Sequence, residues 1–239
     1  MNIIITMAGK SSRFYDSGYN QPKALLPVGN KKMIEHVINM FDPNTCKYHV
    51  VVNSQQLDFY PGLIKYLNQL APNIDVLVIE EHDLGPVYSA LQVSSIKENE
   101  EIIVSYCDFK VQWNYPLFLR HVYGKDGCVV SFKGFHPASF GDTYYAYMKV
   151  KGDQMIELQE KKSYTNNRVE EHASTGIYYF KNFGIFKKYS KKILKEENNI
   201  LPEAYVSLLF NDMVADNLSV IVHEVNKFIC FGTPNDYEQ

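Results

Sequence analysis

The chain has 239 residues, of which 46% are apolar and 21% are charged, so it can fold around a sizeable core and is not disordered. Its 24 basic and 27 acidic residues give a net charge of −3, which argues against a nucleic-acid partner because no strong basic field is present. No apolar run reaches the length needed to cross a bilayer, and no basic segment precedes the short apolar run at the start. We therefore expect a cytoplasmic protein without a membrane partner.

The first half of the sequence alternates β-branched runs with segments of helical periodicity. Strands are predicted at residues 3–6, 48–52, 74–79 and 102–104, and helices at 33–41, 63–70 and 87–93. Apolar strands without polar alternation lie between helical layers, so this order predicts a parallel sheet with helices on both faces. Ligands of such sheets bind at the carboxyl ends of the strands.

After Pro116 the pattern changes to strands joined by short turns. Strands are predicted at residues 128–132, 144–150, 155–159, 174–180, 220–225 and 228–231, and helical stretches at 183–195 and 203–215. The fold class predicted is α/β, doubly wound, with a mainly parallel mixed (Rossmann-like) sheet and a smaller antiparallel half. Without a linker or repeat, residues 1–239 are expected to form a single domain with halves at 1–125 and 126–239.

The segment after the first strand carries the strongest chemical signal. Residues 7–14 read Met-Ala-Gly-Lys-Ser-Ser-Arg-Phe, and residues 21–28 read Gln-Pro-Lys-Ala-Leu-Leu-Pro-Val. Small residues let backbone amides approach a phosphate chain, while Lys10, Arg13 and Lys23 supply positive charge. Glycines required by a Walker loop or a dinucleotide fingerprint are missing. The composition alone leaves open an ordinary strand-to-helix turn with solvated basic residues.

These segments resemble the opening signature of the nucleotidylyltransferases, which join a nucleoside triphosphate to a sugar 1-phosphate or a similar small phosphate. The match consists of Ala8-Gly9, residues 12–14 and residues 22–28. Further resemblances follow in the family's order at residues 80–87, 104–108, 141, 160–161, 176–178 and 232–234. An ordered set of this kind is much more specific than any one glycine spacing.

The resemblance implies that the acceptor phosphate attacks the α-phosphorus in line and that pyrophosphate leaves. Lys23 would bridge the two phosphates, Arg13 would hold the pyrophosphate, and Lys161 would hold the acceptor. Asp108 would bind Mg²⁺, the expected cofactor. The nucleotide-binding residues implied are Ala8, Gly9, Lys10, Ser11, Ser12, Glu80 and Gly85, and the acceptor-binding residues are Gly141, Glu160, Lys161 and Tyr178. Taken singly, these residues have simpler explanations as turn caps or solvated charges.

Two positions depart from the family pattern. Ser11 stands where a second glycine is usual, so the backbone there must keep a conformation that serine can adopt. Cys230 stands where many members have a second metal-binding aspartate, and a thiol is a poor Mg²⁺ ligand. Either one carboxylate suffices, or Glu224 or Asp236 contributes, or the protein only binds nucleotide. The seven histidines show no metal-ligand spacing, and only His82 lies near the expected site.

The sequence narrows the nucleobase of the triphosphate and the acceptor to a few alternatives. A carboxylate at Glu80 would accept a hydrogen bond from the amine of cytosine, so CTP is favoured, with GTP second; backbone reading around Ala8 and Gly85 is the alternative. The expected acceptor is a sugar 1-phosphate of capsule or other surface-polysaccharide biosynthesis. The alternatives are a phosphocholine-like acceptor in an aromatic cage and a non-catalytic nucleotide-binding module. The tyrosines available for a cage are Tyr144, Tyr145, Tyr147 and Tyr178.

Overall fold

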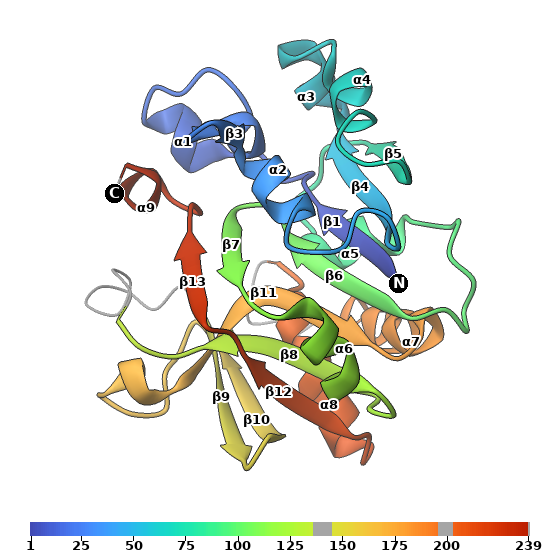
Figure 1. Ribbon diagram of the computed structural model, residues 1–239, viewed down its shortest axis with the longest axis vertical. Coiled ribbons are helices and arrows are strands. Elements are labelled where there is room, and N and C mark those ends of the chain that lie inside the picture. The colour runs from blue at the N-terminus through green and yellow to red at the C-terminus, as the bar shows by residue number, and fades with distance from the viewer. Residues whose placement is uncertain (136–144, 196–202, 239) are drawn as a thin grey trace.

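The computed structural model describes residues 1–135, 145–195 and 203–238. A nine-stranded mixed sheet runs through the molecule in the order β5-β4-β1-β6-β11-β8-β12-β10-β9 (Figure 1). Its first four strands are mutually parallel. They are β5 (Ile74–Ile79), β4 (Lys47–Asn53), β1 (Asn2–Thr6) and β6 (Ile102–Tyr106). Thr6 pairs with Tyr106, so the segments that follow β1 and β6 start side by side.

The other five strands of this sheet are paired mostly antiparallel. They are β8 (Gly127–Phe132), β9 (Ala146–Lys151), β10 (Gln154–Glu160), β11 (His172–Phe180) and β12 (Val220–Glu224). β11 runs antiparallel to β6, β8 and β9, whereas β12 runs parallel to β8. Because β9 pairs with both β10 and β11, the five strands close into a ring of pairings.

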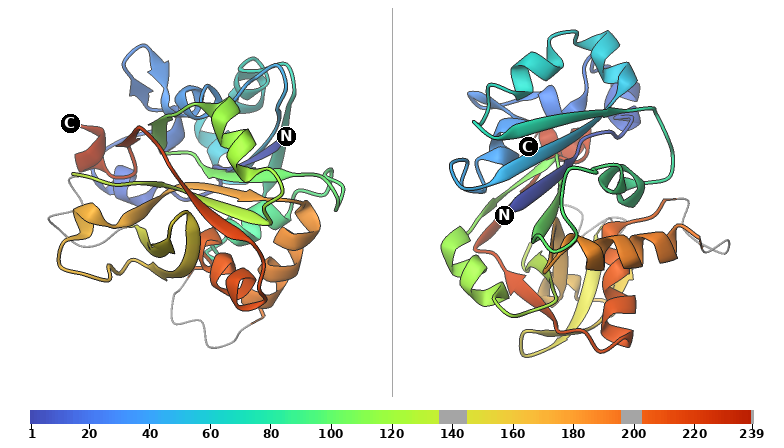
Figure 2. Two further views of the ribbon diagram at one scale, coloured as in Figure 1. Left: turned by 60° about the horizontal axis from the view of Figure 1, so that its bottom comes forward. Right: turned by 90° about the vertical axis from the view of Figure 1, so that its right-hand side faces the viewer.

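Helices pack against both faces of the sheet, because successive residues of β1 point to opposite sides. Ile3 and Ile5 share one buried core with α2, α4 and α6, and Ile4 shares the other with α5, α7 and α8. In the right-hand view of Figure 2, α6 (light green) and α7 (orange) lie on opposite sides. The bounds are α2 Met33–Ile38, α4 Leu63–Leu67, α5 Pro86–Leu91, α6 Tyr115–Val122, α7 Phe183–Ile193 and α8 Leu209–Ala215.

Several helices begin at a side chain that caps the free backbone amides of the first turn. Asn53, Asn114 and Asn182 accept these bonds at α3, α6 and α7, and Thr233 does so at α9. The shorter elements are α1 (Ser12–Asp16), α3 (Ser54–Phe59), α9 (Pro234–Tyr237), the strands β2 (Pro27–Val28) and β3 (Lys31–Lys32), and 3₁₀ turns at Lys23–Leu25, Arg168–Glu170 and Val206–Leu208. No helix among the described residues is long and apolar enough to span a bilayer.

Four of the five predicted helices lie in the right places but end early. The helix predicted at 33–41 ends at Ile38, after which Met40 and Phe41 bond three residues back in a tighter turn. Both side chains remain buried. The helical spacing of apolar residues therefore continues past the end of the α-helix because these residues are buried, although the helix itself has ended. The stretch predicted as helical at 203–215 becomes a 3₁₀ turn followed by α8.

A small separate ladder joins two distant parts of the chain. β7 (Phe109–Gln112) pairs antiparallel with β13 (Lys227–Cys230), with Cys230 opposite Phe109. Phe231 N–H also donates to the backbone carbonyl of Asp108 at 2.8 Å. This ladder therefore brings the last part of the chain to the carboxyl end of β6. The sequence predicted β13 but neither β7 nor α6.

Candidate active site

A cavity of about 810 Å³ opens at the carboxyl ends of β1 and β6, where the fold class predicts a ligand site. Its size lies within the range of small-molecule sites. Residues from both halves line it, and those expected from the sequence are Ala8, Gly9, Lys10, Ser11, Ser12, Arg13, Lys23, Gly85, Asp108, Glu160, Lys161 and Tyr178. Glu80 is not among the lining residues, and Gly141 lies outside the described residues.

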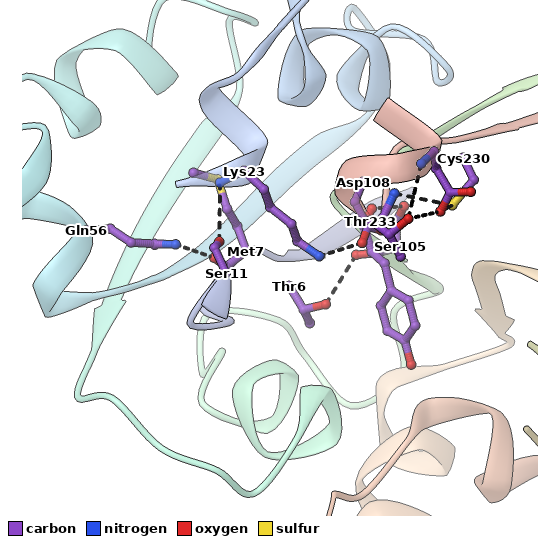
Figure 3. A network of polar contacts seen from close by, with 12 residues as sticks. Thr6, Met7, Ser11, Lys23, Gln56, Ser105, Asp108, Cys230 and Thr233 are labelled. Atoms are coloured by element: carbon purple, nitrogen blue, oxygen red, sulfur yellow. Dashed lines mark hydrogen bonds and ion pairs between the residues drawn. The ribbon is translucent and has the colours of Figure 1, made fainter. Parts of the chain in front are cut away.

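The loop after β1 is held by side chains from β4 and α3. Asn53 donates to the carbonyl of Ala8, and Gln56 donates to that of Met7, both at 2.8 Å. Ser11 adopts a left-handed conformation with φ of 57°, which glycine favours, so serine is accommodated there in a costly conformation. Its hydroxyl accepts a hydrogen bond from the Lys23 backbone N–H at 3.2 Å. That bond ties the loop to the Lys23 segment (Figure 3).

The centre of the site is an ion pair between Lys23 and Asp108. Lys23 Nζ lies 2.5 Å from Asp108 Oδ2, and each side chain is 20% exposed. Burial alone would lower the pKa of the Lys23 ammonium, but the carboxylate of Asp108 outweighs it, so the pKa is raised and the lysine stays charged. Arg13 lies close enough to repel this charge. Figure 3 shows Lys23 reaching from its loop to Asp108 at the end of β6.

The surroundings of Asp108 decide how a metal ion could be held. Burial raises the pKa of the Cys230 thiol to about 12, so the group is neutral and poorly suited to Mg²⁺. Asp236 lines the cavity but accepts a hydrogen bond from the Thr233 hydroxyl at 2.7 Å, within the cap of α9. Glu224 lies outside the lining, beside Lys133 and His172. Among the described residues no group of three ligating side chains could hold a metal.

One carboxylate is nevertheless compatible with Mg²⁺, because this ion commonly takes one or two carboxylates and completes its shell with substrate phosphates and water. Asp108 therefore fits an ion that arrives with a polyphosphate. Gly232 leaves room beside it, since a Cβ there would lie 3.2 Å from Asp108 Oδ2.

The turn between β5 and α5 forms another wall of the cavity. Gly85 has φ of 85° and packs so closely on the second half that a Cβ would lie 2.7 Å from the backbone nitrogen of Ala204. His82 braces the turn, because its Nδ1 accepts from Leu84 N–H at 3.1 Å and its Nε2 lies 2.9 Å from Ser89 Oγ. Burial lowers the pKa of His82, which favours the neutral ring that this arrangement needs.

Charged side chains near this turn are placed differently from the sequence prediction. Glu80 is exposed and lies 3.4 Å from the Ser54 hydroxyl. Lys10 crosses from the loop to Asp83, at 2.8 Å, and to Glu81, at 3.4 Å. The carboxylate-bearing residue packed beside Gly85 is Glu203, whose Cβ lies 3.0 Å from the position of a Gly85 Cβ and which lines the cavity.

The opposite end of the cavity is formed by the second half. Lys161 has φ of 56°, and its Nζ lies 2.7 Å from the Tyr205 hydroxyl. Glu160 accepts a short hydrogen bond from the buried Ser207 hydroxyl, and burial raises the pKa of its carboxyl. Of the four tyrosines available for a cage, Tyr145 and Tyr178 line the cavity, whereas Tyr147 is buried outside the lining and Tyr144 lies outside the described residues.

Glu203, Tyr205 and Ser207 were missed by sequence reasoning. They follow one another on a segment that packs onto the Gly85 turn, where Ala204 N–H donates to the Leu84 carbonyl at 3.1 Å. This contact joins residues more than a hundred positions apart, so no local sequence pattern predicts it. A buried serine bonded to a glutamate would be recognisable only from the tertiary structure.

The chain is similar in sequence to bifunctional proteins named GlmU. GlmU, a bifunctional protein of Methanococcus maripaludis strain C5, is 25% identical over 192 residues, covering 78% of this chain and 42% of that protein. GlmU of Francisella tularensis subsp. holarctica is 24% identical over 252 residues, covering 100% of this chain and 50% of that protein. The chain thus spans about half the length of the curated relatives it matches.

Two solved structures share the fold. The nucleoside-diphosphate-sugar pyrophosphorylase of Vibrio cholerae has a TM-score of 0.82 at 20% identity, covering 100% of this chain and 98% of that chain. The inositol-1-phosphate CTP transferase of T. maritima has a TM-score of 0.73 at 16% identity, covering 98% and 90%. Residues 3–154, more than half of the chain, match the model of the MobA-like NTP transferase domain. The resemblance to nucleotidylyltransferases is therefore confirmed, and the chain belongs to the MobA-like NTP transferase domain family.

Proposed function

We propose that the protein transfers a nucleotidyl group from a nucleoside triphosphate to a small phosphorylated acceptor and releases pyrophosphate. The observation that carries this proposal is the ion pair of Lys23 and Asp108. It lies in one cavity with a small-residue loop on the nucleotide side and with Lys161 on the other side. Residues 1–125 would bind the triphosphate, and residues 126–239 would shape the acceptor site and supply Glu203 to the nucleotide.

Charge and position would supply the catalysis, because in-line attack at phosphorus needs no covalent intermediate on the protein. Lys23 would turn from Asp108 to the α-phosphate and stabilise the charge that develops there. Arg13 would hold the leaving pyrophosphate, and Lys161 would hold the acceptor phosphate. Backbone amides of Ala8 to Ser12 would approach the triphosphate. Mg²⁺, when bound with the triphosphate at Asp108, would neutralise phosphate charge.

The nucleotide proposed is CTP, with Glu203 in the role expected of Glu80. A carboxylate accepts a hydrogen bond from the exocyclic amine of cytosine, whereas the carbonyl oxygen of uracil at that place would be repelled. Glu203 lies beside Gly85 and lines the cavity, and Asp83 is already paired with Lys10. The name of the T. maritima neighbour, a CTP transferase, agrees with this choice.

This assignment predicts that Glu203→Gln lowers the preference for CTP over UTP by about tenfold, the size of one lost base contact. Glu80→Gln is the matched control and should keep the preference, because Glu80 does not line the cavity. The measurement is kcat/KM for each triphosphate with one acceptor. An unchanged preference in Glu203→Gln, or a lost preference in Glu80→Gln, would refute the assignment.

Sugar 1-phosphates and small non-sugar phosphates are both acceptors for this reaction, and either product would be an activated group of the kind used to decorate a surface polysaccharide. The rival proposal, a module that only binds nucleotide, is favoured by Cys230 at the expected metal position. Release of pyrophosphate from each triphosphate, with Mg²⁺ and a panel of small phosphates, separates the two. Transfer requires release that depends on triphosphate and acceptor together; tight nucleotide binding with no release under any condition would support the module.

A further inference from the structure

The basic residues of the cavity are distributed unevenly between its two ends. Lys10, Arg13 and Lys23 come from the nucleotide half, and Lys161 stands at the boundary with the second half. Beyond Lys161 the described lining residues include Glu160 and aromatic side chains but no further lysine or arginine. A ligand bound by its phosphate at the lysines would thus extend toward a carboxylate.

Glu160 is a carboxylate that feels the charge of the adjacent Lys161, but the Lys161 ammonium is bonded to the Tyr205 hydroxyl and does not pair with it. Glu160 stands at the end of β10 and is partly buried, with one oxygen bonded by Ser207. Among residues 1–135, 145–195 and 203–238, no lysine, arginine or histidine forms an ion pair with it. Removing a carboxylate from water is costly unless an opposite charge is supplied. A cationic group of the ligand would supply that charge.

The aromatic walls around Glu160 suit a cation. The rings of Tyr106 and Tyr178 meet edge to face at 5.7 Å, and both residues lie close enough to Glu160 to feel its charge. Tyr205, on the same side, already contacts an ammonium group, because Lys161 Nζ lies over its ring at 4.6 Å from the centroid. Tyrosine faces attract cations through the ring quadrupole.

The same wall offers little to a sugar. Ser174 and Thr175 line it, but the Ser174 hydroxyl donates to Tyr178 at 2.9 Å and the Thr175 hydroxyl donates to the Val130 carbonyl at 3.0 Å. A sugar ring has several hydroxyls that need hydrogen-bond partners. The hydroxyls of Ser174 and Thr175 already donate to other groups of the protein. The hydroxyls of a sugar could donate to Glu160 but would bring no positive charge to that carboxylate.

The geometry points to an acceptor that is a small phosphate bearing an ammonium group, with the phosphate at Lys161 and the ammonium against Glu160 and the tyrosine faces. This inference rests on the proposed function and narrows its acceptor. Primary and quaternary ammonium groups share the necessary charge, and the experiment has an arm for each.

The test compares pairs of acceptors that are similar in size and differ in charge. Phosphocholine is matched with 3,3-dimethylbutyl phosphate, its neutral carbon isostere, and phosphoethanolamine with 2-hydroxyethyl phosphate. Glucose 1-phosphate represents the sugars. In the unmodified protein, kcat/KM for at least one ammonium acceptor should exceed that of its neutral partner by about tenfold or more, the size expected for a desolvated cation contact.

Glu160→Gln should reduce that ratio to within about threefold while the KM for the triphosphate stays unchanged. Glu157→Gln is the matched control, since Glu157 lies on the same strand, pairs with Lys149 at 3.2 Å and does not line the cavity. A Glu160→Gln protein that fails to fold does not affect the comparison of isosteres, which uses the unmodified protein.

The possible failures are distinguishable. Neutral isosteres that react as well as the ammonium acceptors, or glucose 1-phosphate that reacts while the ammonium acceptors do not, would overturn the inference and leave the proposed function standing. Absence of pyrophosphate release with every acceptor would overturn the proposed function, and the inference with it.

Discussion

Replacing Lys23 by alanine is expected to lower kcat by about a hundredfold or more, the range for losing one preorganised charge at a reacting phosphate. Lys23 is the only lysine within the described residues that pairs with the carboxylate at the end of β6. Because its charge acts most strongly where charge develops, the loss should fall on kcat rather than on the KM for the nucleotide. Steady-state kinetics with saturating triphosphate and Mg²⁺ measures it.

Two companions make the result specific. Lys31→Ala removes a lysine that does not line the cavity and should keep kcat within about twofold. Lys23→Arg keeps a positive charge but places it on a planar guanidinium. Its kcat should therefore lie between those of Lys23→Ala and the unmodified protein. Thermal unfolding of each variant checks that the fold persists. A Lys23→Ala protein with unchanged kcat would remove Lys23 from the mechanism.

The second large effect is expected for Asp108→Asn. Asparagine keeps the size of the side chain but loses the charge that a Mg²⁺ ion and Lys23 both require. We expect the Mg²⁺ concentration for half-maximal activity to rise by about tenfold or more and turnover at saturating metal to fall. The measurement is the metal-activation curve at fixed triphosphate.

Asp83→Asn is the matched control for that curve. Asp83 is also a cavity carboxylate paired with a lysine, but its partner is Lys10 in the nucleotide loop. Its variant should follow the metal-activation curve of the unmodified protein. If the curve of Asp108→Asn also overlays that of the unmodified protein, Asp108 is not the metal ligand.

The strands of the first half could be predicted from the sequence because each is a continuous apolar run, and such runs are buried on both faces of a parallel sheet. β1, with Ile3, Ile4 and Ile5 all fully buried, is the clearest case. Prediction failed at α6, although Asn114 and Pro116 mark its start, because Pro116 is also typical of a loop. β7 was missed because four residues with only two apolar positions give too short an alternation.

The site was predictable where its chemistry lies in one segment. Ala8 to Arg13 and Asp108 follow recognisable strands, Lys23 lies in the motif of residues 21–28, and the structure brings all of them to one cavity. Glu80 is exposed and lies outside the cavity lining, because a side chain at a strand end can point to either face and a shift of one residue decides which. Glu203 reaches the base turn only through packing of Ala204 on Gly85, a contact between the two halves.

The most direct test of the central claim follows the phosphorus atoms of the nucleotide. CTP labelled at the α-phosphate, or separately at the γ-phosphate, is incubated with the protein, Mg²⁺ and the best acceptor. Attack at the α-phosphorus predicts that the α label appears in a conjugate of cytidine monophosphate with the acceptor and that the γ label appears in pyrophosphate. A γ label found in the acceptor or in inorganic phosphate, with no labelled conjugate, would contradict nucleotidyl transfer.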